Sequence, residues 1–198
     1  MKKENNELSL HLFVEGKHDI VFYKAFLDTY LRETLGFRDI DYYPYAEKRT
    51  EREKLLQIIN RDPKANYLIC ADLDREFDED LRQKKIEYLS NLFRIDRDTL
   101  EHKIFAVVIE IESWYLAGFT LSFYEKLKID QFFYNNTEQA SKTVFKNIAR
   151  TLRIDDVQLR DTLTKTYRSN FSIEEAKQRN ESFRKFFEKV SSQVKRLN

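Results

Sequence analysis

Apolar positions recur with two different periods along the first two thirds of the chain. Short runs rich in apolar residues at 8–14, 39–45, 67–71 and 104–111 are typical of strands, and the run at 67–71 is apolar throughout, as in a strand buried on both faces. Between these runs, residues 17–35, 50–61 and 79–93 carry apolar side chains at helical spacing, and in the first of these segments Val21 lies beside the apolar stripe. This alternation predicts an α/β fold in which helices cover both faces of a mostly parallel central sheet.

The pattern changes after about residue 134, beyond which the sequence favours helices only. Residues 50–53 (Thr-Glu-Arg-Glu) and 172–175 (Ser-Ile-Glu-Glu) are capping boxes, each expected to open a helix. The last helix is expected to carry an apolar stripe that must pack on something, formed by Phe183, Phe186, Phe187 and Val190. We therefore predict a domain over residues 1–134 and a helical, basic extension over residues 135–198 that packs on it.

Composition excludes several classes of protein. The 198 residues are 35% charged and 41% hydrophobic, which is unlike collagen or low-complexity disorder. The longest apolar stretches, such as residues 105–109, fall far short of the roughly 20 residues of a membrane span, and residues 1–6 lack the core of a signal peptide. A single cysteine, Cys70, excludes an internal disulfide and is expected to fill a buried strand. These features predict a cytoplasmic protein with no membrane contact.

The net charge of +1 hides an uneven distribution. Residues 1–138 contain 21 basic and 27 acidic side chains, a net charge of −6, whereas residues 139–198 contain 14 basic and 7 acidic side chains, a net charge of +7. An acidic body beside a basic tail suits a site that gathers cations next to a surface that attracts phosphate. On charge alone, a solvated helical face is the better explanation of the basic tail.

Acidic side chains follow three of the expected strands. Glu15 ends the first, Asp72 and Asp74 end the third, and Glu112 ends the fourth. Ligands of open parallel sheets bind at the carboxyl ends of the strands, where such carboxylates would converge and repel one another unless a divalent cation sits among them. Hard oxygen ligands favour Mg²⁺ or Mn²⁺. Each acid alone is better explained as a turn residue or a helix cap, but the set together predicts a metal site.

Two segments resemble the motifs of TOPRIM domains. Val14-Glu15-Gly16-Lys17-His18-Asp19, with Val21-Phe22-Tyr23 behind it, resembles the first motif, and Ile69-Cys70-Ala71-Asp72-Leu73-Asp74 resembles the second. This resemblance covers residues 8 to about 118. Residues 108–117, which contain Trp114, are similar to the corresponding stretch of OLD-family and RloB-like TOPRIM nucleases, and residues 179–187 resemble their C-terminal helix. Trp114 itself is expected to pack in the core. Arg75-Glu76-Phe77 departs from the third acid and glycine of the primase and topoisomerase branch, which argues against those two activities.

The resemblance implies metal-dependent phosphodiester chemistry. Glu15 would be a metal ligand or a general base, Asp72 and Asp74 would hold Mg²⁺ or Mn²⁺, and Glu112 would be a fourth acid. Nucleic-acid contacts are expected from Lys17 at a helix start, from Lys142 as the best-placed lysine beyond the acidic motifs, and from Arg179 and Arg184 in the last helices. Solvent-exposed surface charges explain these four basic residues about as well.

Three functions follow from the resemblance. The first is a metal-dependent nuclease of a defence or mobile-element system, working with a separate ATPase subunit because this sequence has no Gly-x-x-x-x-Gly-Lys loop of its own. The second is a non-catalytic TOPRIM-fold sensor or scaffold that binds a partner or nucleic acid, which a site closed by its own side chains would favour. The third is a ribonuclease that matures RNA. The choice between DNA and RNA, and the oligomeric state, stay open.

Overall fold

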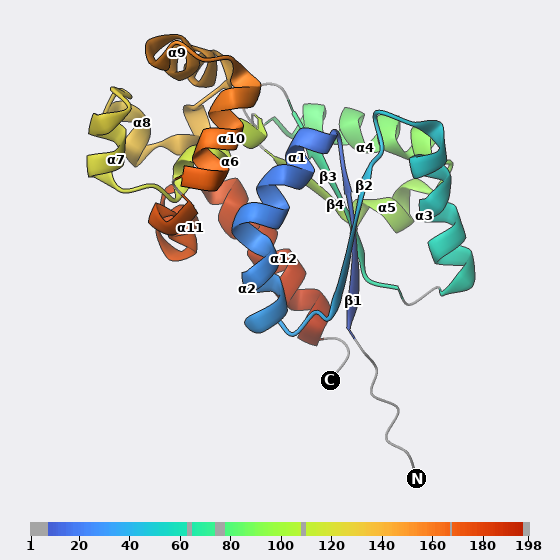
Figure 1. Cartoon of the computed structure of the whole chain (residues 1–198). Helices are drawn as coiled ribbons and strands as arrows, with labels where there is room; N and C mark the ends of the chain where they lie inside the picture. The colour runs from blue at the N-terminus through green and yellow to red at the C-terminus, as the bar shows by residue number, and fades with distance from the viewer. Residues whose placement is uncertain (1–7, 63–64, 74–77, 108–109, 167, 196–198) are drawn as a thin grey trace.

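A computed structural model describes residues 8–62, 65–73, 78–107, 110–166 and 168–195. Within them, four parallel strands form one sheet in the order β2-β1-β3-β4 (Figure 1). The strands are β1 (Ser9–Val14), β2 (Asp39–Pro44), β3 (Tyr67–Asp72) and β4 (Ile104–Val107). The predicted α/β class with a parallel sheet is confirmed.

Side chains of alternating residues along the strands supply two separate cores, one on each face of the sheet. Leu10, Leu12 and Val14 of β1 join the larger core, whereas Phe13 points into the smaller one. In β3, Leu68 and Cys70 belong to the larger core, and the whole strand is buried up to Asp72. This two-sided burial is the reason that residues 67–71 are uniformly apolar.

The smaller core lies under three helices, α3 (Arg49–Arg61), α4 (Glu79–Phe93) and α5 (Arg97–Glu101). Figure 1 shows all three on one side of the sheet. The predicted helix over 79–93 is confirmed, and Asp78 caps it by accepting a hydrogen bond from the amide of Asp80. The expected capping box at Thr50 is wrong, because Lys48 is the N-cap of α3 and makes no side-chain capping bond.

The larger core lies under the helices on the opposite face. The first of these is continuous in sequence but changes in winding, from α1 (Lys17–Phe22) through a π-helical segment (Tyr23–Leu27) to α2 (Asp28–Glu33). The others are α6 (Ile111–Ala117), α7 (Leu121–Lys126), α8 (Phe132–Asn135), α9 (Lys142–Leu152), α10 (Asp156–Thr166), α11 (Ile173–Arg179) and α12 (Glu181–Lys195), with short 3₁₀ turns at Thr137–Gln139 and Arg168–Asn170.

The C-terminal helices share this core with the α/β part. Phe183, Phe186, Phe187 and Val190 of α12 are all buried in the same cluster as β1 and α1. Ser172 caps α11 by accepting a hydrogen bond from the amide of Glu175, as its capping box predicts. No helix among the described residues is long and apolar enough to cross a membrane.

The fourth strand is shorter than the sequence predicts. It was expected to run to Ile111, but β4 ends at Val107, residues 108–109 lie outside the described residues, and α6 begins at Ile111 with Glu110 as its N-cap. Glu112 is therefore in the first turn of a helix and does not end a strand. An apolar run followed directly by an apolar helix has no period change that would mark the boundary.

Candidate active site at the carboxyl edge of the sheet

Glu15 follows β1 directly and contacts two polar side chains, one just after β2 and one in α4. The hydroxyl of Tyr45 donates to Glu15 Oε1 across 3.3 Å, and Lys85 Nζ of α4 lies 2.8 Å from the same oxygen. The side chain of Glu15 is 32% exposed and that of Lys85 is 19% exposed, so this ion pair is partly shielded from water. Glu15 stands where the sequence places it, but a cation of the protein itself already neutralises it.

Asp19 lies next to Glu15, although the sequence pattern assigns it no role. It occupies the first turn of α1, where its Oδ2 accepts a hydrogen bond from the amide of Gly16 at 2.9 Å. Burial raises the pKa of Asp19 to about 6; the Gly16 amide opposes this rise, and the charges of Glu15 and Glu112 add to it. The spacing Gly16-x-x-Asp19, which resembles a capping box, was the sequence signal for its position.

Asp72 is the last residue of β3, at the same edge. Burial raises the pKa of Tyr45 well above its ordinary value, and the charges of Glu15 and Asp72 raise it further. Tyr23 behaves similarly: burial has the largest effect, followed by Cys70, Asp19 and Asp72. Asp72 therefore shares a neighbour with Glu15 and another with Asp19, at the edge of the sheet where the paired strands β1 and β3 end. Asp74 lies outside the described residues.

Glu112 is buried in an internal ion pair. Its carboxylate, 3% exposed, accepts a hydrogen bond from Arg160 Nη2 of α10. The Arg160 guanidinium also lies over the ring of Phe145, 5.2 Å from the ring centre. Arg160 Nε and the buried hydroxyl of Tyr115 have no hydrogen-bond partner among the described residues. The expected role of Glu112 as an open fourth acid is therefore corrected, because α10, which the sequence did not connect to this site, covers it.

Each of the two lysines expected to bind phosphate lies at the start of a helix, where its backbone amide donates to a glutamate side chain. The backbone amide of Lys17 donates to Glu47 Oε1 at 2.9 Å, so a carboxylate of the protein occupies that helix start, while the Lys17 residue is exposed. The amide of Lys142 donates to Glu110, and Lys142 Nζ lies 3.8 Å from Glu110 Oε1. These contacts compete with an incoming phosphate at both positions.

The two arginines are engaged within the C-terminal helices. Arg179 is 11% exposed; its Nη2 donates to the carbonyl of Phe119 at 2.7 Å and to Glu175 at 2.9 Å, and its guanidinium lies over Tyr134. These contacts hold the Arg179 side chain inside the protein, and its expected contact with phosphate stays a prediction. Arg184 is 46% exposed and pairs with Glu181 and Glu188 on the surface of α12.

The carboxylates suit a hard cation chemically, but the described residues do not form a finished metal site. Carboxylate oxygens are the donors that Mg²⁺ and Mn²⁺ prefer, and the raised pKa of Asp19 is a sign of crowded negative charge, which a bound cation would relieve. Within the described part of the chain, however, no group of three or more His, Cys, Asp or Glu side chains could hold a metal ion. The expected third donor, Asp74, lies outside that part, and Glu15 would have to part from Lys85.

Two residues that the sequence assigned to the core are confirmed there. Trp114 is fully buried, and its indole Nε1 donates to Ser182 Oγ at 2.8 Å. Cys70 is 4% exposed, and burial raises the pKa of its thiol to about 12. A thiol that stays protonated near neutral pH is a poor nucleophile, as expected for a residue that fills space in a strand.

Comparison of the chain with models of protein families, with curated proteins and with solved structures found no match.

Proposed function

We propose that this chain is a TOPRIM-like nuclease that depends on a divalent metal. The observation that carries the proposal is the gathering of Glu15, Asp19 and Asp72 at the carboxyl edge of a parallel sheet, where open α/β sheets bind their ligands. All three lie within the two motifs that resemble TOPRIM domains. The four-stranded parallel sheet covered on both faces is compatible with that fold.

In this proposal Glu15 and Asp72, together with Asp74, hold Mg²⁺ or Mn²⁺. A metal bound there would activate water and neutralise charge on the phosphodiester. The Asp19 carboxyl, with its pKa of about 6, can hold or release a proton close to neutral pH beside Glu15. Lys85 would leave Glu15 as the metal binds and would then be free to contact a phosphate oxygen. A separate ATPase subunit and a role in defence belong to the same proposal.

A specific observation favours the second candidate, a non-catalytic sensor or scaffold with the same fold. Lys85 and Arg160 neutralise Glu15 and Glu112 from within the protein, and the pair between Arg160 and Glu112 is almost fully buried. Removing one partner of a buried ion pair destabilises the fold, so the pair between Arg160 and Glu112 is expected to persist whichever of the two functions the protein has. Whether Glu15, Asp72 and Asp74 bind a metal ion therefore distinguishes the nuclease from the scaffold.

A cleavage assay tests the proposal directly. Purified wild-type protein is incubated with Mg²⁺ or Mn²⁺ and either supercoiled plasmid DNA or structured RNA, beside the double variant Glu15→Gln, Asp72→Asn. We expect the wild type to cut one of the substrates and the variant to lose at least about 100-fold of the rate, because both oxygen ligands are weakened.

The matched control is the double variant Glu33→Gln, Asp39→Asn, which removes two exposed acids away from this edge of the sheet. It is expected to cut like the wild type, and thermal melts report whether all the proteins are folded. Equal cutting by wild type and the Glu15, Asp72 variant would assign the activity to a contaminant. No cutting by folded wild type with either metal would favour the scaffold.

A further inference from the structure

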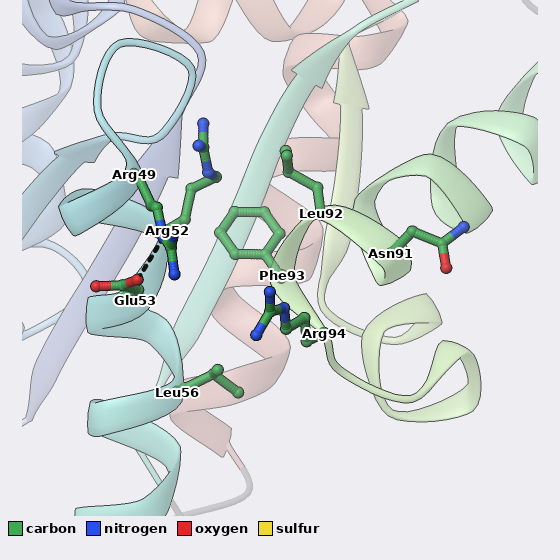
Figure 2. Close-up of a pocket in the computed structure, with 8 residues that line it drawn as sticks. All are labelled: Arg49, Arg52, Glu53, Leu56, Asn91, Leu92, Phe93 and Arg94. Atoms are coloured by element: carbon green, nitrogen blue, oxygen red, sulfur yellow. Dashed lines mark hydrogen bonds and ion pairs between the residues drawn. The ribbon is translucent and has the colours of Figure 1, made fainter.

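A hollow rich in arginine lies between α3 and α4, on the face of the sheet that carries the smaller core. It has a volume of about 310 Å³ and contains three arginines, Arg49, Arg52 and Arg94. Figure 2 shows Arg49 and Arg52 extending from α3 and Arg94 from the end of α4, with the ring of Phe93 between them. We name this feature the arginine hollow; Glu53, Leu56, Asn91 and Leu92 complete its lining.

The charges of the arginine hollow are only partly compensated by the protein. Arg49 Nε pairs with Glu53 Oε1 at 2.7 Å, and Arg52 Nη1 donates to the carbonyl of Tyr45 at 3.1 Å. The side chain of Arg94 has no acidic partner among the residues that the structure describes. Three guanidinium groups and one carboxylate leave a net charge of +2 around the hollow.

Arg94 is held at this place by an unusual backbone conformation. It follows the last residue of α4 with φ 56° and ψ 40°, in the left-handed region, where glycine is the common residue. Its amide donates to the carbonyl of Ser90, which closes the end of the helix. The end of the helix requires only this backbone conformation, which glycine adopts most easily. The charged side chain of Arg94 is therefore not needed to end the helix.

We propose that the arginine hollow binds a phosphate monoester, carried by a mononucleotide or by the end of a nucleic-acid strand. A phosphate monoester has a charge of about −1.5 to −2 at neutral pH, which matches the net charge of the lining. Guanidinium groups bind phosphate oxygens through paired hydrogen bonds, and the partly exposed apolar side chains of Leu56 and Leu92 offer a surface for the attached sugar or base. The volume lies at the lower end of the roughly 300–1,000 Å³ of small-molecule sites.

Tyr45 connects the arginine hollow to the acidic edge. Its hydroxyl donates to Glu15, its carbonyl accepts from Arg52, and its ring packs edge-on against Phe93, with the ring centres 5.3 Å apart. A strand end held in the arginine hollow would therefore lie next to the site proposed for cleavage. The binding itself does not depend on the proposed nuclease function, since none of its contacts uses a metal or a carboxylate of that site.

Calorimetric titration of the full-length protein with AMP and with adenosine, in EDTA, tests the proposal. We expect AMP to bind and adenosine not to bind, and Arg94→Gln to weaken AMP binding by about tenfold or more, because one charge-assisted contact is lost. Arg49→Gln should act in the same direction. Arg61→Gln is the matched control, because Arg61 is an exposed arginine at the other end of α3 and outside the arginine hollow.

Short oligonucleotides with a 5′-phosphate or a 5′-hydroxyl distinguish the source of the phosphate. Tighter binding of the phosphorylated strand than of AMP assigns the arginine hollow to strand ends, whereas equal affinities assign it to mononucleotides. The proposal is overturned if neither AMP nor the 5′-phosphate improves binding, or if Arg61→Gln weakens it as much as Arg94→Gln does. EDTA prevents metal-dependent cleavage, so a failed nuclease assay leaves this result unaffected.

Discussion

The carboxyl group of Asp19 binds its proton more tightly than an ordinary aspartate does. Burial is the main cause, and the neighbouring carboxylates of Glu15 and Glu112 add to it. Because its folded pKa of about 6 lies above the ordinary value of 3.8, the folded chain holds a proton in this range that the unfolded chain has lost. The stability that this proton contributes is fully present below pH 3.8 and is lost as the pH rises through 6.

Asp19→Asn is therefore expected to stabilise the fold at pH 7 to 8. Asparagine keeps an oxygen that can accept the hydrogen bond of the Gly16 amide but removes the charge. We expect the free energy of unfolding at pH 7.5 to rise by about 1 to 3 kcal/mol, and the decline between pH 4 and 7 to flatten. Urea unfolding at several pH values measures both effects.

The control for this substitution is Asp39→Asn, at an exposed position where β2 begins. It is expected to leave the pH dependence of the wild type unchanged. If Asp19→Asn instead destabilises the protein at every pH, its carboxylate is a required helix cap, and the crowding of charge at this edge is of no consequence for stability.

At the scale of elements, α6 and α12 are joined by a buried polar network. Trp114 Nε1 donates to Ser182 Oγ, and Ser182 Oγ in turn donates to Asn180 Oδ1 at 2.9 Å. Asn180 also accepts from the amide of Phe183, and its Nδ2 donates to Thr137 at 3.1 Å. Trp114 and Ser182, one from each of the two segments that resemble OLD-family and RloB-like proteins, thus contact each other directly, and this network docks one helix on the other.

Ser182→Ala is expected to destabilise the protein by about 1 to 3 kcal/mol, because the buried indole N–H of Trp114 loses its partner. Chemical unfolding followed by tryptophan fluorescence suits this measurement, since Trp114 is the single tryptophan. Ser192→Ala, an exposed serine of the same helix, should change stability by less than about 0.5 kcal/mol. Equal effects of the two substitutions would show that the network contributes nothing measurable.

The helix after β1 shows how local winding modifies a sequence pattern. A single regular helix was expected between Gly16 and Gly36, with Val21 beside the buried stripe. The π-helical segment at Tyr23–Leu27 adds width to one turn, and Val21 is 41% exposed while Tyr23 and Leu27 are fully buried. π-Helical turns are common at functional sites, and this one places Tyr23 beside Asp19 and Asp72.

At the scale of the whole molecule, the larger core extends across both predicted parts of the chain. Its residues come from β1 and α1 as well as from α9, α10 and α12, so the C-terminal helices cover a face of the sheet that would otherwise be exposed. Phe171 packs on Phe26 with ring centres 4.5 Å apart, and it contacts Gly118 so closely that a Cβ there would lie 2.6 Å from the ring.

Truncation after residue 134 is expected to yield an aggregated or unfolded product. It would expose the apolar surface of β1, α1 and α6 that α12 covers, and would leave Trp114 without Ser182. Size-exclusion chromatography and circular dichroism of the fragment check this expectation, with the full chain as reference. A monomeric, cooperatively folding fragment would show that residues 1–134 form an independent domain.

The sequence by itself determined the class of fold and the strand-end position of Glu15 and Asp72. Apolar runs that alternate with segments of helical periodicity specify a parallel sheet. A residue that follows a strand in sequence lies at the end of that strand however the rest of the chain packs. The same local logic placed the caps at Ser172 and the buried side chains of Cys70 and Trp114.

The tertiary structure alone decided which charges meet. The partners of Glu15 and Glu112 are Lys85 and Arg160, separated from them by 70 and 48 positions, and no local pattern encodes such pairs. The pKa of Asp19 and the arginine hollow likewise arise from elements that are distant in sequence. Electrostatic contacts depend on distances in space, whereas hydrophobic periodicity depends on spacing along the chain; this is the physical reason that the sequence predicted the framework and the fold decided the site.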